Sequence, residues 1–195
     1  MWMKNVPLEG RYVTLVPLAF EHVKALINAV QDGEAWRLWY ASVPKPEQME
    51  DYVASAISDV EKGNIAYAVI NNQSQEIVGT TRYYQVDSDN RRAAIGYTWY
   101  ANSACRTAIN TEAKLLLLEN LFVEHDAIAV EFRTHFLNHT SRRAIERLGA
   151  KLDGILRAHQ ITRDGSLRDT AVYSIIASEW PAVRNNLLHK LTLKM

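Results

Sequence analysis

The stretch Ile95–Leu117, IGYTWYANSACRTAINTEAKLLL, decides the fold of this chain. It begins as an apolar, aromatic strand that ends at Tyr100, continues as a polar loop without glycine or proline, and becomes a leucine-rich helix near Asn110. The first backbone N–H groups of a helix are unpaired and its dipole is positive there, so such a junction can bind an anion. Arg106 adds a full positive charge. The stretch is typical of a loop that holds a pyrophosphate group, although an ordinary strand–loop–helix connection has the same pattern.

The segments on both sides predict a single mixed α/β domain. Apolar runs predict strands over Arg11–Pro17, Ile65–Ile70, Ile77–Val86, Ala93–Tyr100, Ala129–His135, Leu152–Ile161 and Leu167–Ile176. Helical spacing predicts helices over Glu21–Asp32, Lys45–Gly63, Thr111–Glu124 and Thr140–Leu148, and Ser178 begins a last one. A right-handed crossover through Thr111–Glu124 would make its two flanking strands parallel. We therefore expect one domain over residues 1–195, with a central mixed sheet of about seven strands and helices on both faces.

Composition and charge exclude several classes of protein. The chain has 195 residues, of which 48% are hydrophobic, and this suits one globular domain with a substantial core. The formal net charge is zero, which argues against a duplex-binding protein, because such proteins carry an excess of basic residues. The sole cysteine, Cys105, cannot form an internal disulfide, and neither a signal core nor a run of about 18 apolar residues is present. The sequence predicts a cytoplasmic protein without membrane or nucleic-acid partners.

The histidine and cysteine residues do not form a complete metal-binding or nucleophilic motif. His135 and His139 are four residues apart, but they lie on either side of a strand-to-helix junction, and no Cys or carboxylate completes a ligand set. Cys105 precedes a helix N-terminus, which can lower a thiol pKa, yet no adjacent base is evident. We therefore expect no metal and no covalent cysteine intermediate.

Several motifs resemble one branch of a known enzyme family. They are Glu9–Leu18 (EGRYVTLVPL), Asn110–Leu118 (NTEAKLLLL), Asn138–Ala150 (NHTSRRAIERLGA), Asp153–His159 and Asp169–Trp180 (DTAVYSIIASEW). Through them the chain resembles the RimJ/RimL-like (ribosomal-protein N-acetyltransferase-like) branch of the GNAT acyltransferases along nearly its full length. The resemblance implies transfer of an acetyl group from acetyl-CoA to a primary amine. It also implies the GNAT fold, in which the two parallel strands splay apart and the acetyl donor lies in the gap.

The resemblance assigns the donor site to the central loop and to two residues of the next helix. The family signature Gln/Arg-x-x-Gly-x-Gly/Ala falls on Cys105, Ala108 and Asn110, so neither glycine is present. The implied cofactor-binding residues are Thr98, Trp99, Tyr100, Arg106, Thr107, Ala108, Ile109, Asn110, Thr111, Asn138 and Ser141. Backbone N–H groups near Thr98–Tyr100 would polarise the thioester carbonyl. Nearby basic residues, namely Arg133, Arg142, Arg143, Arg147 and Lys151, suit the 3′-phosphate of CoA or simply form a solvated face, and Lys114 has the same two interpretations.

Catalysis is assigned to Ser141, Asn138 and His159. By resemblance, Asn138 would hydrogen-bond the pantetheine arm and Ser141 would offer a hydroxyl near the CoA sulfur, while Ile145 stands where many relatives have a Tyr acid. A departing thiol has a pKa of about 8.5 and needs little protonation. The alternative is that Asn138 and Ser141 only cap their helix. His159 and Asp153 are the candidate bases for the acceptor.

The acceptor site is predicted from five residues. Trp36, Trp39 and Tyr40 lie in the link between the first two helices, where they would form a wall of the site or pack in the core. Arg82 and Tyr84 share one face of a strand. The absence of a strong base favours a protein or peptide α-amine over a Lys side chain. A small-molecule acceptor (an antibiotic, polyamine or amino acid) and a non-catalytic acyl-CoA-binding module remain open, and so do a monomer and a homodimer.

Overall fold

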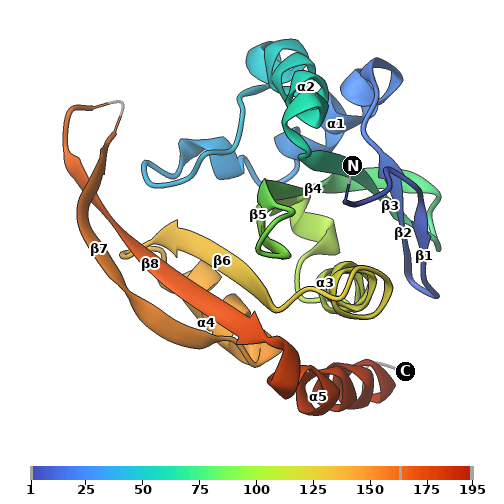
Figure 1. The fold of residues 1–195 in the computed structure, drawn as a ribbon. Helices are drawn as coiled ribbons and strands as arrows, with labels where there is room; N and C mark the ends of the chain where they lie inside the picture. The colour runs from blue at the N-terminus through green and yellow to red at the C-terminus, as the bar shows by residue number, and fades with distance from the viewer. Residues whose placement is uncertain (1, 163, 194–195) are drawn as a thin grey trace.

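This is a computed structural model, and it describes residues 2–162 and 164–193. Within these residues, eight strands form one sheet in the order β1-β2-β3-β4-β5-β6-β8-β7 (Figure 1). The strands are β1 (Leu8–Glu9), β2 (Val13–Pro17), β3 (Ile65–Asn71), β4 (Glu76–Asp87), β5 (Arg92–Tyr100), β6 (Ala129–His135), β7 (Lys151–Ile161) and β8 (Leu167–Ile176). The helices of these described ranges are α1 (Val23–Gln31), α2 (Met49–Ser58), α3 (Ile109–Glu119), α4 (His139–Leu148) and α5 (Trp180–Thr192). The predicted mixed α/β fold is confirmed.

The prediction of about seven strands was one strand too low. The additional strand is β1, which has only two residues and pairs with β2 through Leu8↔Leu15 and Glu9↔Thr14. Two residues are too few for an alternating apolar pattern, so the sequence gives no signal for this strand.

Side chains alternate between the two faces of the sheet, and this alternation places the helices. On β4, the Thr80 hydroxyl lies 2.8 Å from the Tyr52 hydroxyl of α2. Three residues later on the same strand, Tyr83 donates a 2.7 Å hydrogen bond to the Leu117 carbonyl of α3. Successive residues of a strand point to opposite faces, so α2 and α3 cover opposite faces of the sheet. Helices on both faces were predicted and are found.

A buried carboxylate fixes α3 against the start of β2. Glu112, in the first turn of α3, is 6% exposed and accepts hydrogen bonds from three successive backbone N–H groups, those of Arg11 (3.0 Å), Tyr12 (2.6 Å) and Val13 (2.9 Å). These bonds provide hydrogen-bond partners for the buried carboxylate and for the three backbone N–H groups, as buried polar groups require. The N-terminal end of α3 is therefore held in place, and the loop that precedes it is held with it.

The strands β7 and β8 extend as a long hairpin beyond the body of the sheet (Figure 1). The side chains of β7 are mostly exposed, whereas most of β8 is buried between β6 and β7. No helix in residues 2–162 and 164–193 is both long and apolar enough to span a membrane.

Candidate active site

A gap opens between β5 and β6, the two parallel strands at the centre of the sheet. They pair only at their beginnings, through Arg92↔Ala129, Ala93↔Val130 and Ala94↔Glu131. Beyond Ala94, β5 continues to Tyr100 without any further register partner on β6 among the described residues. The two strands therefore diverge toward the loop that follows β5 (Figure 1). The parallel pairing and the splay were both predicted, and both are confirmed.

A β-bulge in β5 lies beside this gap. The register of the β4–β5 pair shifts here, and Thr81 alone lies opposite both Tyr97 and Thr98. Tyr97 has a φ of 50°, which is uncommon for a residue with a side chain. Its carbonyl oxygen accepts hydrogen bonds from Thr80 Oγ1 (3.2 Å) and the Tyr52 hydroxyl (3.4 Å). Bulges of this kind end or redirect strand pairing. Here the bulge lies on β5, which pairs with β4 along one edge and borders the gap along the other.

The loop after β5 turns sharply into α3. Arg106 has a φ of 62°, a left-handed conformation in which glycine is more usual, so the absence of glycine does not prevent the turn. Thr107 Oγ1 donates to the Ala104 carbonyl at 2.6 Å and accepts from the Ile109 N–H at 3.3 Å. The first turn of α3 follows directly, with Ala108 as its buried N-cap residue. The predicted combination of a loop, an arginine and a helix N-terminus is present.

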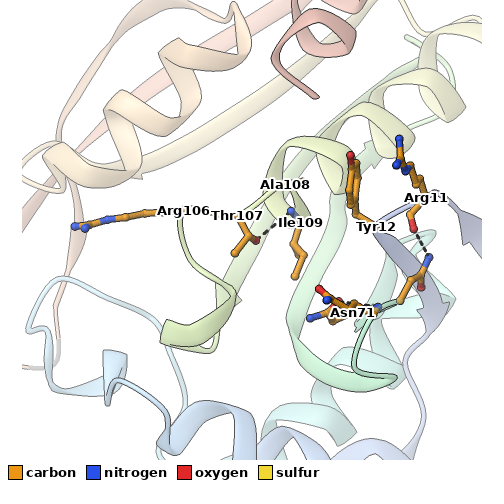
Figure 2. Close-up of a pocket in the computed structure, with 9 residues that line it drawn as sticks. Arg11, Tyr12, Asn71, Arg106, Thr107, Ala108 and Ile109 are labelled. Carbon is orange, nitrogen blue, oxygen red and sulfur yellow. Dashed lines mark hydrogen bonds between the residues drawn. The ribbon is translucent and has the colours of Figure 1, made fainter. Parts of the chain in front are cut away.

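A cavity of about 570 Å³ adjoins one side of this loop. Its lining residues are Arg11, Tyr12, Asn71, Asn72, Gln73, Arg106, Thr107, Ala108 and Ile109. Figure 2 shows that the Arg106 side chain extends away from Tyr12 and Asn71. The loop therefore has this cavity on one side and the long Arg106 side chain on the other. The residues from the start of β2 and from the β3–β4 turn were not predicted, because nothing in the sequence connects them with the loop.

The beginning of α4 lies directly after β6, where the gap is open. The Asn138 Oδ1 accepts a 3.0 Å hydrogen bond from the Ser141 N–H and thereby caps α4. The cap uses the Asn138 side chain but only the backbone of Ser141. The half-buried Ser141 hydroxyl is therefore not part of this cap.

The predicted basic cluster is largely engaged within the protein. Arg142 donates to the Tyr173 hydroxyl (2.9 Å), and Arg147 donates to Thr111 Oγ1 (3.0 Å), which links α4 to the first turn of α3. Arg133 and Lys151 form ion pairs with Glu131 and Glu179, respectively. The two ion pairs offset the charges of Arg133 and Lys151, whereas the hydrogen bonds of Arg142 and Arg147 to neutral hydroxyls leave their positive charge in place.

Arg82 is buried between two tyrosine rings on the face opposite α3. Its guanidinium carbon lies 4.3 Å from the ring centroid of Tyr52 and 4.6 Å from that of Tyr97, and the residue is 5% exposed. The ring of Tyr84 meets that of Tyr97 edge to face, with centroids 5.2 Å apart, and burial raises the pKa of Tyr84 to about 12. Arg82 and Tyr84 thus share one face as predicted. Tyr52 and Tyr97, which complete the cluster, were not singled out from the sequence.

The predicted aromatic wall divides into two parts. Trp36 packs against the hydrophobic core, whereas Trp39 is 58% exposed and lies edge to face with both Tyr40 (5.5 Å) and His135 (5.0 Å). His135 Nδ1 accepts from the Leu137 N–H at 3.0 Å, and burial lowers the pKa of His135. Trp39 and Tyr40 therefore lie at the end of β6, close to the start of α4.

The two candidate bases lie on β7. His159 is exposed, and its Nδ1 lies 3.1 Å from Thr170 Oγ1 of β8. Asp153 accepts a 2.9 Å hydrogen bond from Ser174 Oγ. Both partners belong to β8 rather than to α4. Among the described residues, no group of three or more His, Cys, Asp or Glu side chains is arranged to hold a metal ion.

Lys114 is buried in α3 directly beneath the bulge. It is 5% exposed, and its Nζ donates to Thr98 Oγ1 at 2.6 Å and to Thr81 Oγ1 at 3.0 Å. These acceptors are neutral hydroxyls, and burial lowers the pKa of Lys114 from its ordinary value of 10.5 to about 7. The sequence suggested a phosphate ligand or a solvated residue, and the buried position fits neither interpretation.

We expect Lys114→Met to raise the melting temperature at pH 6. Below about pH 7 the Lys is protonated in both the folded and unfolded chains, so the folded state carries the full cost of a buried charge. Above pH 10.5 the Lys is neutral in both states and this cost disappears. The variant should melt at least about 2–4 °C above wild type at pH 6, which corresponds to about 1 kcal/mol for a chain of this size, and the difference should shrink toward pH 10. Calorimetry across this range provides the test, and a lower melting temperature at pH 6 would contradict the expectation.

The chain is similar to known acetyltransferases in both sequence and structure. The model of the acetyltransferase (GNAT) domain matches residues 13–151. A structure from T. thermophilus described as an acetyltransferase is 32% identical, with a TM-score of 0.86 over 98% of this chain and 100% of that one. A GCN5-related N-acetyltransferase from Brucella melitensis is 28% identical, with a TM-score of 0.88 over 98% of this chain and 87% of that one.

A more distant structure shares the fold. Mycobacterium smegmatis RimJ in complex with CoA-disulfide is 20% identical, with a TM-score of 0.78 over 94% of this chain and 92% of that one. None of the curated protein sequences matches this chain significantly.

Proposed function

The chain belongs to the acetyltransferase (GNAT) family, and we propose that it transfers an acetyl group from acetyl-CoA to the α-amine of a peptide or protein. The matched family domain covers well over half of the chain, and the protein is accordingly an acyltransferase. The family uses acetyl-CoA as its donor. We further propose that residues 1–195 form one domain of the RimJ/RimL-like branch, on the basis of the motifs in the α3 and α4 segments. A single cysteine in the chain favours a cytoplasmic location.

The observation that carries the proposal is the bulged strand β5 at the edge of the β5–β6 gap. A thioester in this gap would have its carbonyl oxygen near the backbone N–H groups of Thr98–Tyr100, which would stabilise negative charge on that oxygen. Its phosphates would lie at the Arg106 loop and the N-terminus of α3. Asn138 would orient the pantetheine arm, and Ser141 would lie near the sulfur.

In the proposed reaction, the neutral amine attacks the thioester carbonyl carbon directly. The C–N bond forms and the C–S bond breaks, with no covalent enzyme intermediate. The sulfur leaves as a thiolate or takes a proton from the Ser141 hydroxyl or from a water bound to it, and this donor regains a proton from solvent. The amine loses one proton to solvent or to a base. His159 and Asp153 are the proposed bases. Both residues lie on β7, where their hydrogen-bond partners belong to β8. This arrangement suits a weakly basic amine, which needs no strong base in direct contact.

The proposed acceptor site lies on the face opposite α3, between the link after α1 and the strands β4 to β6. Trp39 and Tyr40 would form one wall, with Arg82 and Tyr84 on the other side. Of the acidic residues in the link and in α2, Glu34 and Glu47 form ion pairs with Arg37 and Lys45, whereas Glu50 and Asp51 are exposed in the first turn of α2. The buried cation of Arg82 favours a peptide over a polyamine, because it would repel a polycation.

Acetyl-CoA turnover tests the proposal. Release of the CoA thiol should be measured across a panel of free-terminus peptides, polyamines, aminoglycosides and amino acids. We expect the fastest release with peptides. Turnover only with a small molecule would show that the acceptor is a small molecule and not a peptide. CoA binding without turnover of any amine would show that the protein is a non-catalytic acyl-CoA-binding module.

We expect Ser141→Ala to lower kcat about 10-fold or more while the affinity for CoA stays nearly unchanged. A positioned proton donor typically contributes a factor of about 100 or more, and a thiol leaving group needs less help than this. Steady-state kinetics and calorimetry with CoA measure the two quantities. Thr140→Ala removes an exposed hydroxyl from the adjacent residue and serves as the matched control.

The Asn138 cap provides a contrasting variant. Asn138→Ala should lower the free energy of unfolding by about 1 kcal/mol, because it removes the side-chain acceptor for the Ser141 N–H. Ser141→Ala keeps that bond and should leave stability unchanged within about 0.5 kcal/mol. If Ser141→Ala loses stability but keeps kcat, the hydroxyl is structural and the catalytic assignment fails.

A further inference from the structure

Three polar side chains form a closed group on the α3 face of the bulge. Lys114 Nζ donates to Thr98 Oγ1 and to Thr81 Oγ1, and the two hydroxyl oxygens lie 2.8 Å apart. Thr81 is the single residue of β4 that lies opposite the two-residue bulge, and Thr98 is the second residue of that bulge. One ammonium group therefore ties both sides of the irregular pairing together.

The bulge needs such a tie because its backbone is strained and its second edge is unpaired. Tyr97 has a left-handed φ of 50°, which is unfavourable for a residue with a side chain. On the β6 side, the pairing of β5 stops after Ala94 within the described residues. The neighbouring β4 alone would hold this segment in register. A strained segment with one free edge keeps its geometry only where surrounding contacts determine it.

We propose that Lys114 is a positioning residue for acyl transfer, which fixes the bulge of β5 through its hydrogen bond to Thr98. The inference rests on the proposed function, because it concerns the carbonyl-binding geometry of the same site. Lys114 lies on the α3 face, whereas the acetyl group and the amine would meet at the edge and the opposite face of the sheet. It therefore acts through Thr98 and the strand and does not touch the reacting atoms.

The buried Lys114 side chain lowers the stability of the fold, and a positioning role accounts for its presence. A buried ammonium whose partners are two hydroxyls loses hydration that neutral acceptors only partly replace. A methionine would fill a similar volume, and Thr81 and Thr98 could then hydrogen-bond to each other over their present 2.8 Å. A group that lowers stability and is nevertheless held in fixed geometry beside a proposed site is typical of a functional residue. The lowered pKa of Lys114 agrees with this burial.

Three variants separate positioning from simple packing. Thr98→Val removes the hydroxyl that links Lys114 to the bulge, whereas Thr81→Val removes the link to β4 and keeps the 2.6 Å bond to Thr98. Lys114→Met removes the charge and both links. We expect Thr98→Val and Lys114→Met to lower kcat at least about 10-fold with the acceptor KM within about 2-fold of wild type, and Thr81→Val to have a clearly smaller effect. Positioning of the carbonyl affects the transition state more than the binding of the amine, which is why kcat and KM should separate.

A second measurement does not depend on activity. Hydrogen exchange monitored by mass spectrometry over residues 95–101 should accelerate at least about 5-fold in Thr98→Val and Lys114→Met, and much less in Thr81→Val. Both assays use the full chain, and melting temperatures show whether each variant is folded.

The two readouts distinguish failure of this inference from failure of the proposed function. An active wild type with unchanged kcat in Thr98→Val would overturn the positioning role. Equal losses of kcat and melting temperature in all three variants would also overturn it, because they indicate packing alone. If wild type turns over no amine, the proposed function fails. Exchange over residues 95–101 then decides the inference by itself, with faster exchange supporting a fixed bulge and unchanged exchange refuting it.

Discussion

Arg106→Ala should weaken CoA binding about 10- to 100-fold. Hydrogen bonds to a charged group contribute about 1.5–3 kcal/mol, and each 1.4 kcal/mol is a factor of ten in the dissociation constant. The loop offers no lysine and no glycine-rich cradle, so Arg106 and the first N–H groups of α3 are the main groups available for a pyrophosphate. Calorimetric titration with CoA measures the effect directly.

Two variants show whether a loss of affinity comes from the guanidinium or from the backbone. Arg106→Gly also removes the charge but suits the φ of 62°, so it should lose as much affinity as Arg106→Ala while being slightly more stable. Arg91 is an exposed arginine with a similar φ of 47° at the opposite end of β5, and Arg91→Ala should bind CoA like wild type. Wild-type affinity in Arg106→Ala would refute the assignment of the loop as the phosphate site.

The fold was largely predictable because the signals that define it are local. The strand, loop and helix of Ile95–Leu117 are consecutive in the chain, and the parallel pairing of β5 with β6 follows from the crossover rule. The splay of these strands was predicted only through family resemblance, since periodicity does not report strand separation. The left-handed φ of Arg106 was not predictable, because its residue type does not favour that conformation.

The parts of the site that the sequence did not reveal depend on contacts between distant residues. Lys114 was predicted to be a phosphate ligand or a solvated residue, but it binds Thr81 and Thr98. Glu112 was not singled out, although it binds the backbone of residues 11–13. Tyr52 lies within the helix predicted over Lys45–Gly63, but nothing in the sequence connects it with Arg82, on which its ring stacks. A charged residue on a helix is usually solvated, and only tertiary packing determines when it is buried instead.

The acceptor should be an α-amine rather than a Lys side chain, and the discrimination should exceed about 100-fold at pH 7. Direct attack requires the neutral amine. An α-amine with a pKa of about 7.8 is neutral in about one molecule in seven at pH 7, whereas a Lys with a pKa of about 10.4 is neutral in fewer than about one in a thousand. The two proposed bases, His159 and Asp153, are an imidazole and a carboxylate, and groups of these types are too weakly basic to deprotonate a Lys ammonium with a pKa of about 10.4 to a large extent at pH 7. The ionisation of the acceptor therefore sets the rate.

A peptide with a free N-terminus and one internal Lys tests this expectation in a single reaction. Mass spectrometry of the products should locate the acetyl group at the terminus, and kcat/KM should rise with pH until the α-amine is neutral. A second peptide with a terminal residue of lower amine pKa should shift the profile downward by the same amount, whereas a profile set by an enzyme group would stay in place. Acetylation confined to Lys would refute the terminal assignment. Acetylation of neither position, with turnover of a small amine, would make a small molecule the acceptor.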